Sequence, residues 1–562
     1  MFWQRKKKEI APLPDITEVS TVINGIDYGI VDPSRKWQML KTQKRFAAWA
    51  FFISFGLIMQ GFDLVANGQL AALPEFKKKF GTREKDGSYL VHAHVLTAWS
   101  SVAPACEVVT AFIYAPLLEK YGRKPGIIVS AFVSTAAVLI QQYANNWKVH
   151  LIGRGVNGFA IGIIFTISPL WIGEISRPEL RGFFLCFFNT AIVTGQCGVV
   201  IVTHIGDQIH GKWQWWLPVV AMYIFPIILV AGYWWFPESP YWLLREGRKA
   251  EAVDCLRRIH GIKEEGFYVA EVRRIEEEIR IVQEVQNSED HKPIVIFGVD
   301  WSHELDCFRG SNRMRTFASV LVAWAQQLIG APFVVGYATY FVQLIGVSKP
   351  FNLTIALYIL MVVSSCCAFP LTEILGRRTL LVNPGFFLVF VLFLIGVMGC
   401  VPKAHEKAAN YAIVAFMYVW TVIFQVTISA TGFVIASEVA TMRLRAATQG
   451  LVTIFNAVAS IVMCVILPYL MNPDQANLKG KLGFAFMGTG SIVAFLGFFI
   501  YPETKGLSIE KIDYLYEIKT PPRHFKKVAA SIDWESVLSA PSTAVAVKND
   551  ITHQEKAVDP EA

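Results

Sequence analysis

The chain is organised around the stretch Met59-Gln60-Gly61-Phe62-Asp63-Leu64-Val65-Ala66-Asn67-Gly68-Gln69, which lies inside the first long apolar segment, beginning near Phe46. An apolar segment of this length is typical of a helix that crosses a membrane. An aspartate at the centre of such a helix costs about 2.5–3.5 kcal/mol on insertion scales. The position of Asp63 therefore indicates either a functional carboxylate or one that is hydrogen-bonded to neighbouring helices for structural reasons.

The composition of the chain is that of a membrane protein. Hydrophobic residues make up 54% of its 562 residues and charged residues only 17%, whereas soluble domains carry about 25% charged residues. The net charge of +8 comes largely from basic residues in short loops between apolar segments. This is the bias of cytoplasmic loops, so we expect no nucleic-acid partner.

Apolar segments long enough to span a bilayer, about 17–25 residues each, occur in two groups of six. The first group fills residues 46–236 and the second fills residues 316–501, with a charged stretch at 237–315 between them. Residues 1–45 and 502–562 are polar. We predict an all-α membrane protein with twelve transmembrane helices in two six-helix pseudo-symmetric halves, a cytoplasmic helical linker, an N-terminal arm and a cytoplasmic tail.

The basic residues predict the orientation of the chain. Twelve spans return both termini to one side of the membrane, and most basic clusters fall in alternate loops, as the positive-inside rule requires of cytoplasmic loops. The run Lys77-Lys78-Lys79 in the first outer loop is the exception. We therefore expect both termini to be cytoplasmic.

The two groups of segments repeat each other. Leu118-Glu119-Lys120-Tyr121-Gly122-Arg123-Lys124 follows the second segment, and Thr372-Glu373-Ile374-Leu375-Gly376-Arg377-Arg378 follows the eighth. Glu174 precedes Arg181 after the fourth segment, as Glu438 precedes Arg445 after the tenth. Two parallel six-helix repeats indicate a transporter whose binding site lies between the halves near the midplane.

Further motifs cover nearly the whole membrane region in a fixed order. They are Glu119-Lys120-Tyr121-Gly122-Arg123-Lys124, Gly153-Arg154-Gly155, Glu174 with Arg181-Gly182, Pro237-Glu238-Ser239-Pro240 with Trp242-Leu243, Gln326-Gln327-Leu328, Gly376-Arg377-Arg378 and Pro502-Glu503-Thr504-Lys505-Gly506. In this order and spacing they resemble the sugar porters of the major facilitator superfamily. Three stretches resemble the fungal α-glucoside, maltose-permease branch: Gly61-Phe62-Asp63 followed by residues 72–81, residues 336–341, and Asn189 followed by Gln196.

The resemblance implies a proton-coupling pair. Asp63 matches the acid that proton-coupled members carry in the first span, and Arg154 matches its counter-charge in the fourth. Burial disfavours a charged carboxylate and a nearby cation favours it, so a pair that opens and closes would bind and release a proton. The alternative for Arg154 is a brace between helices. Glu107, in the second span, is a member of the proton relay, a ligand of a sugar hydroxyl, or the structural partner of a basic group.

A sugar site needs side chains that both donate and accept hydrogen bonds, together with flat apolar faces. Asn189 and Gln196 are two helical turns apart and share one face of the fifth span. The expected substrate-binding residues, from spacing and resemblance together, are Asn189, Gln196, Gln326, Gln327, Tyr337, Phe433 and Asn456. Taken singly, each polar one is equally explained by packing between helices. Pro332 and Ser429 depart from the pattern of hexose porters, which counts against recognition of a hexose more than against transport itself.

Charged residues at the cytoplasmic helix ends form a further set. The resemblance implies that they make an inter-helix salt-bridge latch that stabilises the outward-facing state. Ordinary positive-inside anchoring explains the arginines but not the acids that accompany them. The set consists of Glu119, Arg123, Glu174, Arg181, Glu373, Arg377, Glu438 and Arg445.

These features predict a proton-coupled importer of α-glucosides such as maltose, in the plasma membrane, with a small-molecule sugar, a proton and the lipid bilayer as partners. The alternatives are a porter for another mono- or disaccharide and a transporter-like receptor that senses a sugar. The sequence contains no metal-ligand cluster, nucleophile elbow or phosphate-binding loop. We therefore expect no enzymatic activity, no cofactor and no metal site.

Overall fold

The computed structural model describes residues 43–534, except 85–86, 88, 177, 263, 287–294, 297–298, 301, 442–443, 506, 508 and 533, and two short strands at 22–23 and 26–27. Most of the predicted N-terminal arm and the end of the predicted tail therefore lie outside the described residues.

Six spans form the first half. Five are single helices, and the sixth is made of two helices: α2 (Lys44–Leu70), α4 (Ala93–Tyr121), α5 (Lys124–Gln142), α6 (Trp147–Ile175), α7 (Pro178–Asp207), and α8 (Trp213–Ala221) with α9 (Ile224–Tyr233). The first two spans are joined by the short helix α3 (Pro74–Phe80) and an antiparallel pair of strands, β3 (Thr82–Arg83) and β4 (Tyr89–Leu90).

Six spans form the second half. Four are single helices: α16 (Pro350–Leu375), α17 (Arg377–Met398), α20 (Arg445–Met471) and α21 (Leu482–Ile500). Span seven is made of α14 (Asn312–Leu328), the π-helical turn η2 (Pro332–Gly336) and α15 (Ala338–Leu344). Span ten is made of α18 (Glu406–Phe424), the π-helical turn η4 (Gln425–Ser429) and α19 (Ala430–Val439). Two 3-10 turns, η3 (Lys403–His405) and η5 (Lys479–Lys481), lie in loops.

The remaining elements lie between the halves in sequence or at the two ends of the chain. Between the halves come α10 (Pro240–Arg245), α11 (Lys249–His260), α12 (Glu265–Gln286), the strand pair β5 (Val295–Ile296) and β6 (Val299–Asp300), and α13 (Ser302–Asp306). After the twelfth span come α22 (Ile509–Glu517), the turn η6 (Pro522–His524) and α23 (Phe525–Ser531). Near the N-terminus β1 (Val22–Ile23) pairs with β2 (Ile26–Asp27).

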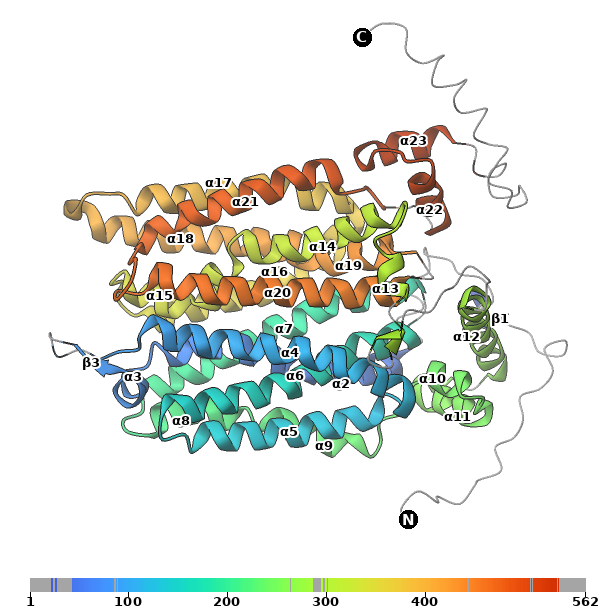
Figure 1. Cartoon of the computed structure of the whole chain (residues 1–562), viewed down its shortest axis with the longest axis horizontal. Helices are drawn as coiled ribbons and strands as arrows, with labels where there is room; N and C mark the ends of the chain where they lie inside the picture. Colours follow the sequence, from blue (N-terminus) through green and yellow to red (C-terminus); the bar gives the residue numbers. More distant parts are fainter. Residues whose placement is uncertain are drawn as a thin grey trace, which may run out of the picture.

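The long helices lie side by side, with the blue and cyan helices of the first half beside the yellow and orange helices of the second (Figure 1). The helices α10, α11, α12, α22 and α23 gather at one end of the bundle, which we call the linker end. Helix α3 and strand β3 lie at the opposite end, which we call the α3 end.

Span seven is the irregular one. Within the described residues, eleven helices are long and apolar enough to cross a membrane, and the twelfth span is the interrupted α14–η2–α15. Its interruption has a local cause, because Gly330 adopts φ 107° and Pro332 has no N–H to continue a helical ladder. With this span included, the structure confirms the predicted twelve transmembrane helices in two six-helix halves.

Small residues bring α2 and α7 into backbone contact. A Cβ atom added to Gly61 would lie 1.9 Å from the carbonyl oxygen of Ile192, and one added to Gly195 would lie 2.0 Å from that of Ile58. Close approach through small residues is a usual way for helices to associate in a membrane, where apolar burial contributes little. This contact fixes the position of Asp63, which is only two residues from Gly61 on α2.

The described part of the predicted tail contains two helices that the sequence analysis did not recognise. Arg315 at the start of α14 forms an ion pair with Asp513 of α22 and lies 4.6 Å from the ring centre of Tyr516. Ile512 and Leu515 are buried on the same helix. Apolar residues at this helical spacing were the signal that would have revealed α22.

The glycine contact yields a prediction. We expect Gly195→Ala to destabilise the folded protein by about 1–3 kcal/mol, because the new methyl group meets the backbone of α2 rather than a movable side chain. The melting temperature of the detergent-purified protein measures the effect. Gly488→Ala is the matched control, since apart from the backbone of its own helix no atom lies within 4 Å of a Cβ at that position. Equal melting temperatures for the two variants would contradict the packing argument.

Candidate functional site

A buried ion pair lies inside the first half. Arg154 of α6 donates through Nη1 to Oδ1 of Asp63 on α2, and both side chains are 3% exposed. The guanidinium also lies 3.5 Å from the backbone carbonyl oxygen of Asp63. The structure therefore brings the two predicted proton-coupling residues into direct contact.

A third residue that the sequence analysis missed joins this pair. Asn157 of α6 donates through Nδ2 to Oδ1 of Asp63 at 2.8 Å, and its own Oδ1 accepts a hydrogen bond from Ser134 of α5 at 3.0 Å. Asn157 is fully buried. Its spacing of three residues from Arg154 places both side chains on one face of α6, which is the signal that would have identified it.

Glu107 lies close to the pair but outside the ion contact. It is half-buried on α4, within electrostatic range of both Asp63 and Arg154. Cys464 of α20 lies within range of Glu107 from the second half. Glu107 therefore lies near both the charge pair and α20 of the second half.

The two halves meet at a polar cluster near the middle of the bundle. Asn189 of α7 donates through Nδ2 to Oε1 of Gln425 at 3.1 Å, and its Oδ1 accepts from the hydroxyl of Ser429 at 2.7 Å. Gln326 of α14 donates to the backbone carbonyl of Ser429 at 3.3 Å. Gln425 and Ser429 begin and end the turn η4, and the sequence analysis did not select either as a binding residue.

Two more predicted binding residues contact each other nearby. Gln327 donates through Nε2 to Oδ1 of Asn456 on α20 at 3.1 Å. A pocket adjoins them between the centre of the bundle and the linker end, and its lining includes Phe165 of the first half. The complete lining is Phe165, Ala323, Gln326, Gly432, Gln449, Val452, Thr453 and Asn456.

The other predicted binding residues are placed differently. Gln196 is buried on α7, and its Oε1 has no hydrogen-bond partner among the described residues. Tyr337 points to the first half, where its hydroxyl bonds the hydroxyl of Ser100, so it connects the halves instead of joining Gln326. The side chain of Phe433 lies outside the described residues.

The bundle is closed at the α3 end by contacts between the halves. Asn472 donates to the carbonyl of Val91 at 3.0 Å, and Thr339 donates to Gln69 at 2.8 Å. A Cβ on Gly68 would lie 2.4 Å from the carbonyl oxygen of Gly336. The central cluster is therefore covered on this side by α2, α4 and the interrupted span seven.

An acid of the second half caps a helix of the first at this end. Asp474 accepts from the backbone N–H of Ala93, the first residue of α4, and from Nδ1 of His92, both at 3.1 Å. Burial alone would raise the pKa of Asp474, but the hydrogen bonds from Ala93, Asn472 and His92 together lower it below its usual value. Asp474 thus remains charged and stabilises the positive end of the α4 dipole.

Helix α3 crosses between the halves at the same end. Its Phe76 and Phe80 pack on the buried rings of Trp99 and Trp215. Its Lys77 reaches the second half and donates to Oε1 of Gln343 at 2.8 Å. Burial lowers the pKa of Lys77 to about 8. Lys77 belongs to the lysine run that departs from the positive-inside rule. In the structure its side chain forms a contact between the two halves.

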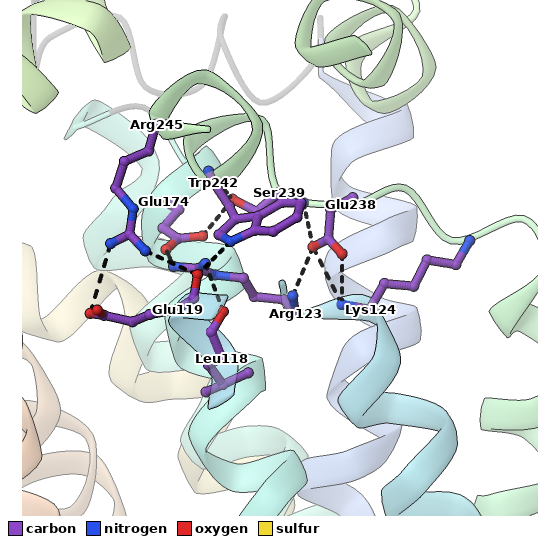
Figure 2. A network of polar contacts seen from close by, with 9 residues as sticks. All are labelled: Leu118, Glu119, Arg123, Lys124, Glu174, Glu238, Ser239, Trp242 and Arg245. Carbon is purple, nitrogen blue, oxygen red and sulfur yellow. Dashed lines mark hydrogen bonds and ion pairs between the residues drawn. The ribbon is translucent and has the colours of Figure 1, made fainter. Parts of the chain in front are cut away.

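At the linker end, Arg123 is held by two acids (Figure 2). Its guanidinium pairs with Glu174 of α6, and its backbone N–H donates to Glu238 at 2.9 Å. Ser239 donates to the other oxygen of Glu174 at 2.5 Å. Gly122 precedes Arg123 with φ 87°, a left-handed value that favours glycine.

The second half repeats this network. Arg377 donates through Nη2 to Glu438 at 2.9 Å, and its backbone N–H donates to Glu503 at 2.9 Å. Thr504 donates to Glu438 at 2.6 Å, as Ser239 does to Glu174. The roles of Glu238 and Glu503 were not predicted, although the recurrence of Pro-Glu-Ser and Pro-Glu-Thr after the two halves was visible in the sequence.

The predicted latch residues are therefore only partly brought together. The pairs Arg123–Glu174 and Arg377–Glu438 each join helices of the same half. Glu119 is largely exposed and lies 3.8 Å from Arg245 of α10. The side chains of Arg181, Glu373 and Arg445 lie outside the described residues.

Two six-helix halves with a polar cluster between them and a charge pair beside it define a membrane transporter of the major facilitator type. The model of the family described as "Sugar (and other) transporter" matches residues 49–516. The chain belongs to this family, which makes it a multi-pass membrane transporter and not an enzyme.

Relatives and solved structures agree with this assignment. "MFS transporter fmqE" of Aspergillus fumigatus is 27% identical over 522 residues, covering 89% of this chain and 92% of the relative. "Alpha-glucosides permease MPH3" of Saccharomyces cerevisiae is 27% identical over 500 residues, covering 87% and 80%. The solved structure of the proton:xylose symporter XylE is similar with a TM-score of 0.67 and 17% identity, covering 84% of this chain and 99% of that one, which shows the shared fold.

The burial of Lys77 yields a pH prediction. A lysine in water has a pKa of about 10.4, whereas Lys77 in the closed α3 end has a pKa of about 8. At a pH between these two pKa values, closing the α3 end therefore releases the proton of Lys77. We expect the closed state to gain population as the pH rises from 8 towards 10. Spin labels at Gln208→Cys and Lys407→Cys, in opposite halves at the α3 end, report the distance between the halves.

The matched comparison is Lys77→Gln in the same labelled background. This variant keeps a hydrogen-bond donor but cannot titrate, so its distance distribution is expected to stay constant over that pH range. If the distance distribution changes with pH equally in the labelled protein with Lys77 and in the Lys77→Gln variant, titratable groups other than Lys77 cause the pH dependence.

Proposed function

We propose that this protein is a proton-coupled importer of α-glucosides such as maltose, located in the plasma membrane with its linker end and both termini in the cytoplasm. The observation that carries the proposal is the buried ion pair of Asp63 and Arg154 beside a polar cluster between two six-helix halves. A carboxylate that exchanges a proton while the halves rock would connect proton entry to sugar entry.

The charges support an alternating cycle. In the described conformation the α3 end is closed and Asp63 is paired, which corresponds to a carrier closed to the outside. When the pair separates, a carboxylate in the bundle interior is stabilised by protonation, because an uncompensated buried charge is costly. The membrane potential assists proton entry by about 2.3 kcal/mol per charge per 100 mV.

The polar cluster supports a polyhydroxylated substrate. Side-chain amides donate and accept at once, and Asn189, Gln425 and Gln326 currently direct these groups at one another or at Ser429. A sugar entering between the halves would replace these bonds with bonds to its hydroxyl groups. The choice of α-glucosides follows the relative named an alpha-glucosides permease and the maltose-permease motifs in the sequence.

The main test measures uptake of labelled maltose and a panel of other sugars in transporter-null yeast. We expect the wild type to accumulate maltose above the external concentration and a protonophore to abolish the accumulation. Asp63→Asn is expected to equilibrate and exchange sugar without accumulating it, since an amide cannot carry the proton. Asp254→Asn, an exposed acid of α11, is the matched control and should behave as the wild type.

The outcomes separate the alternatives. Accumulation that survives in Asp63→Asn would overturn the role of this carboxylate. Uptake of a different sugar would correct the substrate. An absence of uptake of every sugar at normal surface expression would instead support the sugar-sensing receptor.

The cluster yields a separate prediction on affinity. We expect Asn189→Leu to raise the KM for the transported sugar about tenfold or more, because a lost hydrogen bond with a buried polar partner corresponds to about 1–3 kcal/mol. Initial uptake rates over a range of sugar concentrations measure it. Thr427→Val is the control, since Thr427 lies in the same turn η4 but donates to the carbonyl of Ile423 in its own helix. An unchanged KM would place the sugar elsewhere.

A further inference from the structure

A hydrogen-bonded chain through three helices ends on the carboxylate of Asp63. Ser134 of α5 donates to Asn157 of α6, and Asn157 donates to Asp63 of α2. Ser134 is 1% exposed and Asn157 is 0% exposed. Because the hydroxyl of Ser134 donates to the amide oxygen, the amide nitrogen of Asn157 is directed at Asp63. The orientation of the amide is thus set from the side opposite the carboxylate.

Oδ1 of Asp63 receives two donors of different kinds. Arg154 supplies a charged donor and Asn157 supplies a neutral one. The attraction of Arg154 depends on the negative charge of Asp63 and falls when a proton binds. The bond from Asn157 is stronger to the charged carboxylate but survives protonation, since the carbonyl oxygen of a protonated carboxyl group still accepts a hydrogen bond. A proton that adds to Oδ2 therefore leaves the Asn157 bond in place.

We propose that Asn157 is a positioning residue for proton coupling, which holds the carboxyl group of Asp63 in place through both protonation states and is itself oriented by Ser134. The inference rests on the proposed function, because it concerns the proton that Asp63 carries. In this proposal Asn157 acts on the carboxyl group of Asp63 and does not need to contact the sugar.

The charged and titratable surroundings of the site are few among the described residues. Two charged side chains lie near Asp63: Arg154 on α6 and Glu107 on α4. Cys106 is next to Glu107 on α4. Within range of Arg154 are His150 on α6, Tyr337 of span seven and Cys464 on α20. None of these supplies the neutral donor that contacts Oδ1, so removal of Asn157 isolates one interaction.

The experiment compares the pH dependence of sugar accumulation in the full-length protein. Asn157→Leu removes the donor and keeps the branched shape and the number of heavy atoms, and a hydrogen bond to a charged group corresponds to about one order of magnitude in proton affinity. Because the lost donor favoured the charged carboxylate, we expect the half-maximal pH to move up by about one unit. Ser134→Ala, which removes the donor to Asn157 together with a 3.5 Å contact to Sδ of Met59, should move it in the same direction by less.

The double variant tests the chain itself. Asn157→Leu with Ser134→Ala is expected to match Asn157→Leu alone, whereas additive shifts would show that Ser134 acts independently and would overturn the chain. Ser130→Ala is the matched control, because Ser130 lies one turn away on α5 and donates to the carbonyl of Ala160 on α6 at 2.7 Å. It should lower stability and leave the pH profile unchanged.

The outcomes separate this inference from the proposed function. A wild type whose accumulation does not depend on pH or on Asp63 would overturn proton coupling as a whole. A wild type that depends on both, with an unchanged profile in Asn157→Leu, would overturn the positioning role alone. If Asn157→Leu does not fold, Asn157→Ala carries the same expected shift and Ser134→Ala the smaller shift in the same direction.

Discussion

An apolar bundle can hold a charge only where another charge or a set of hydrogen-bond donors neutralises it, and this constraint governs the first half of the protein. Asp63 is 2% exposed and meets Arg154 and Asn157. The helices α2 and α6 must therefore keep a fixed register, and the backbone contact of α2 with α7 at Gly61 and Gly195 helps to hold α2 in place. Removing one member of such a pair commonly costs about 3–5 kcal/mol, so the site and the fold of this half depend on each other.

The second half meets a different requirement. Its central polar side chains are neutral amides and hydroxyls, which are less costly in a membrane than ions. They bond one another within the half, as Gln327 and Asn456 do, or bond Asn189 across the interface of the halves. Among the described residues its ion pairs lie at the two ends, where Asp474 caps α4 and where Arg377 pairs with Glu438. This distribution leaves a centre that can open without exposing an unpaired charge of the second half.

The sequence predicted the architecture well because the apolar periodicity and the repeated Gly-Arg motifs are local signals. A charge in an apolar segment requires a partner, and the resemblance to sugar porters identified Arg154 as the partner of Asp63. It did not identify Asn157, Gln425 or Ser429, since their importance comes from which helices face each other. Span seven is the case in between: Pro332 was visible, but the sequence did not show the positive φ of Gly330 or the approach of the Gly336 carbonyl oxygen to Gly68 of α2.

The π-helical turn η4 has a consequence for the rotational phase of span ten. A π turn contains one residue more than an α turn, and each residue rotates an α-helix by about 100°. The extra residue at Gln425–Ser429 therefore sets the angle between the faces of α18 and α19. The side chains of α18 and those of α19 can therefore face different directions, although both helices belong to span ten. A deletion of one residue would merge the two faces into a single helical stripe, so the length of this segment, and not only its composition, determines which side chains reach the interface.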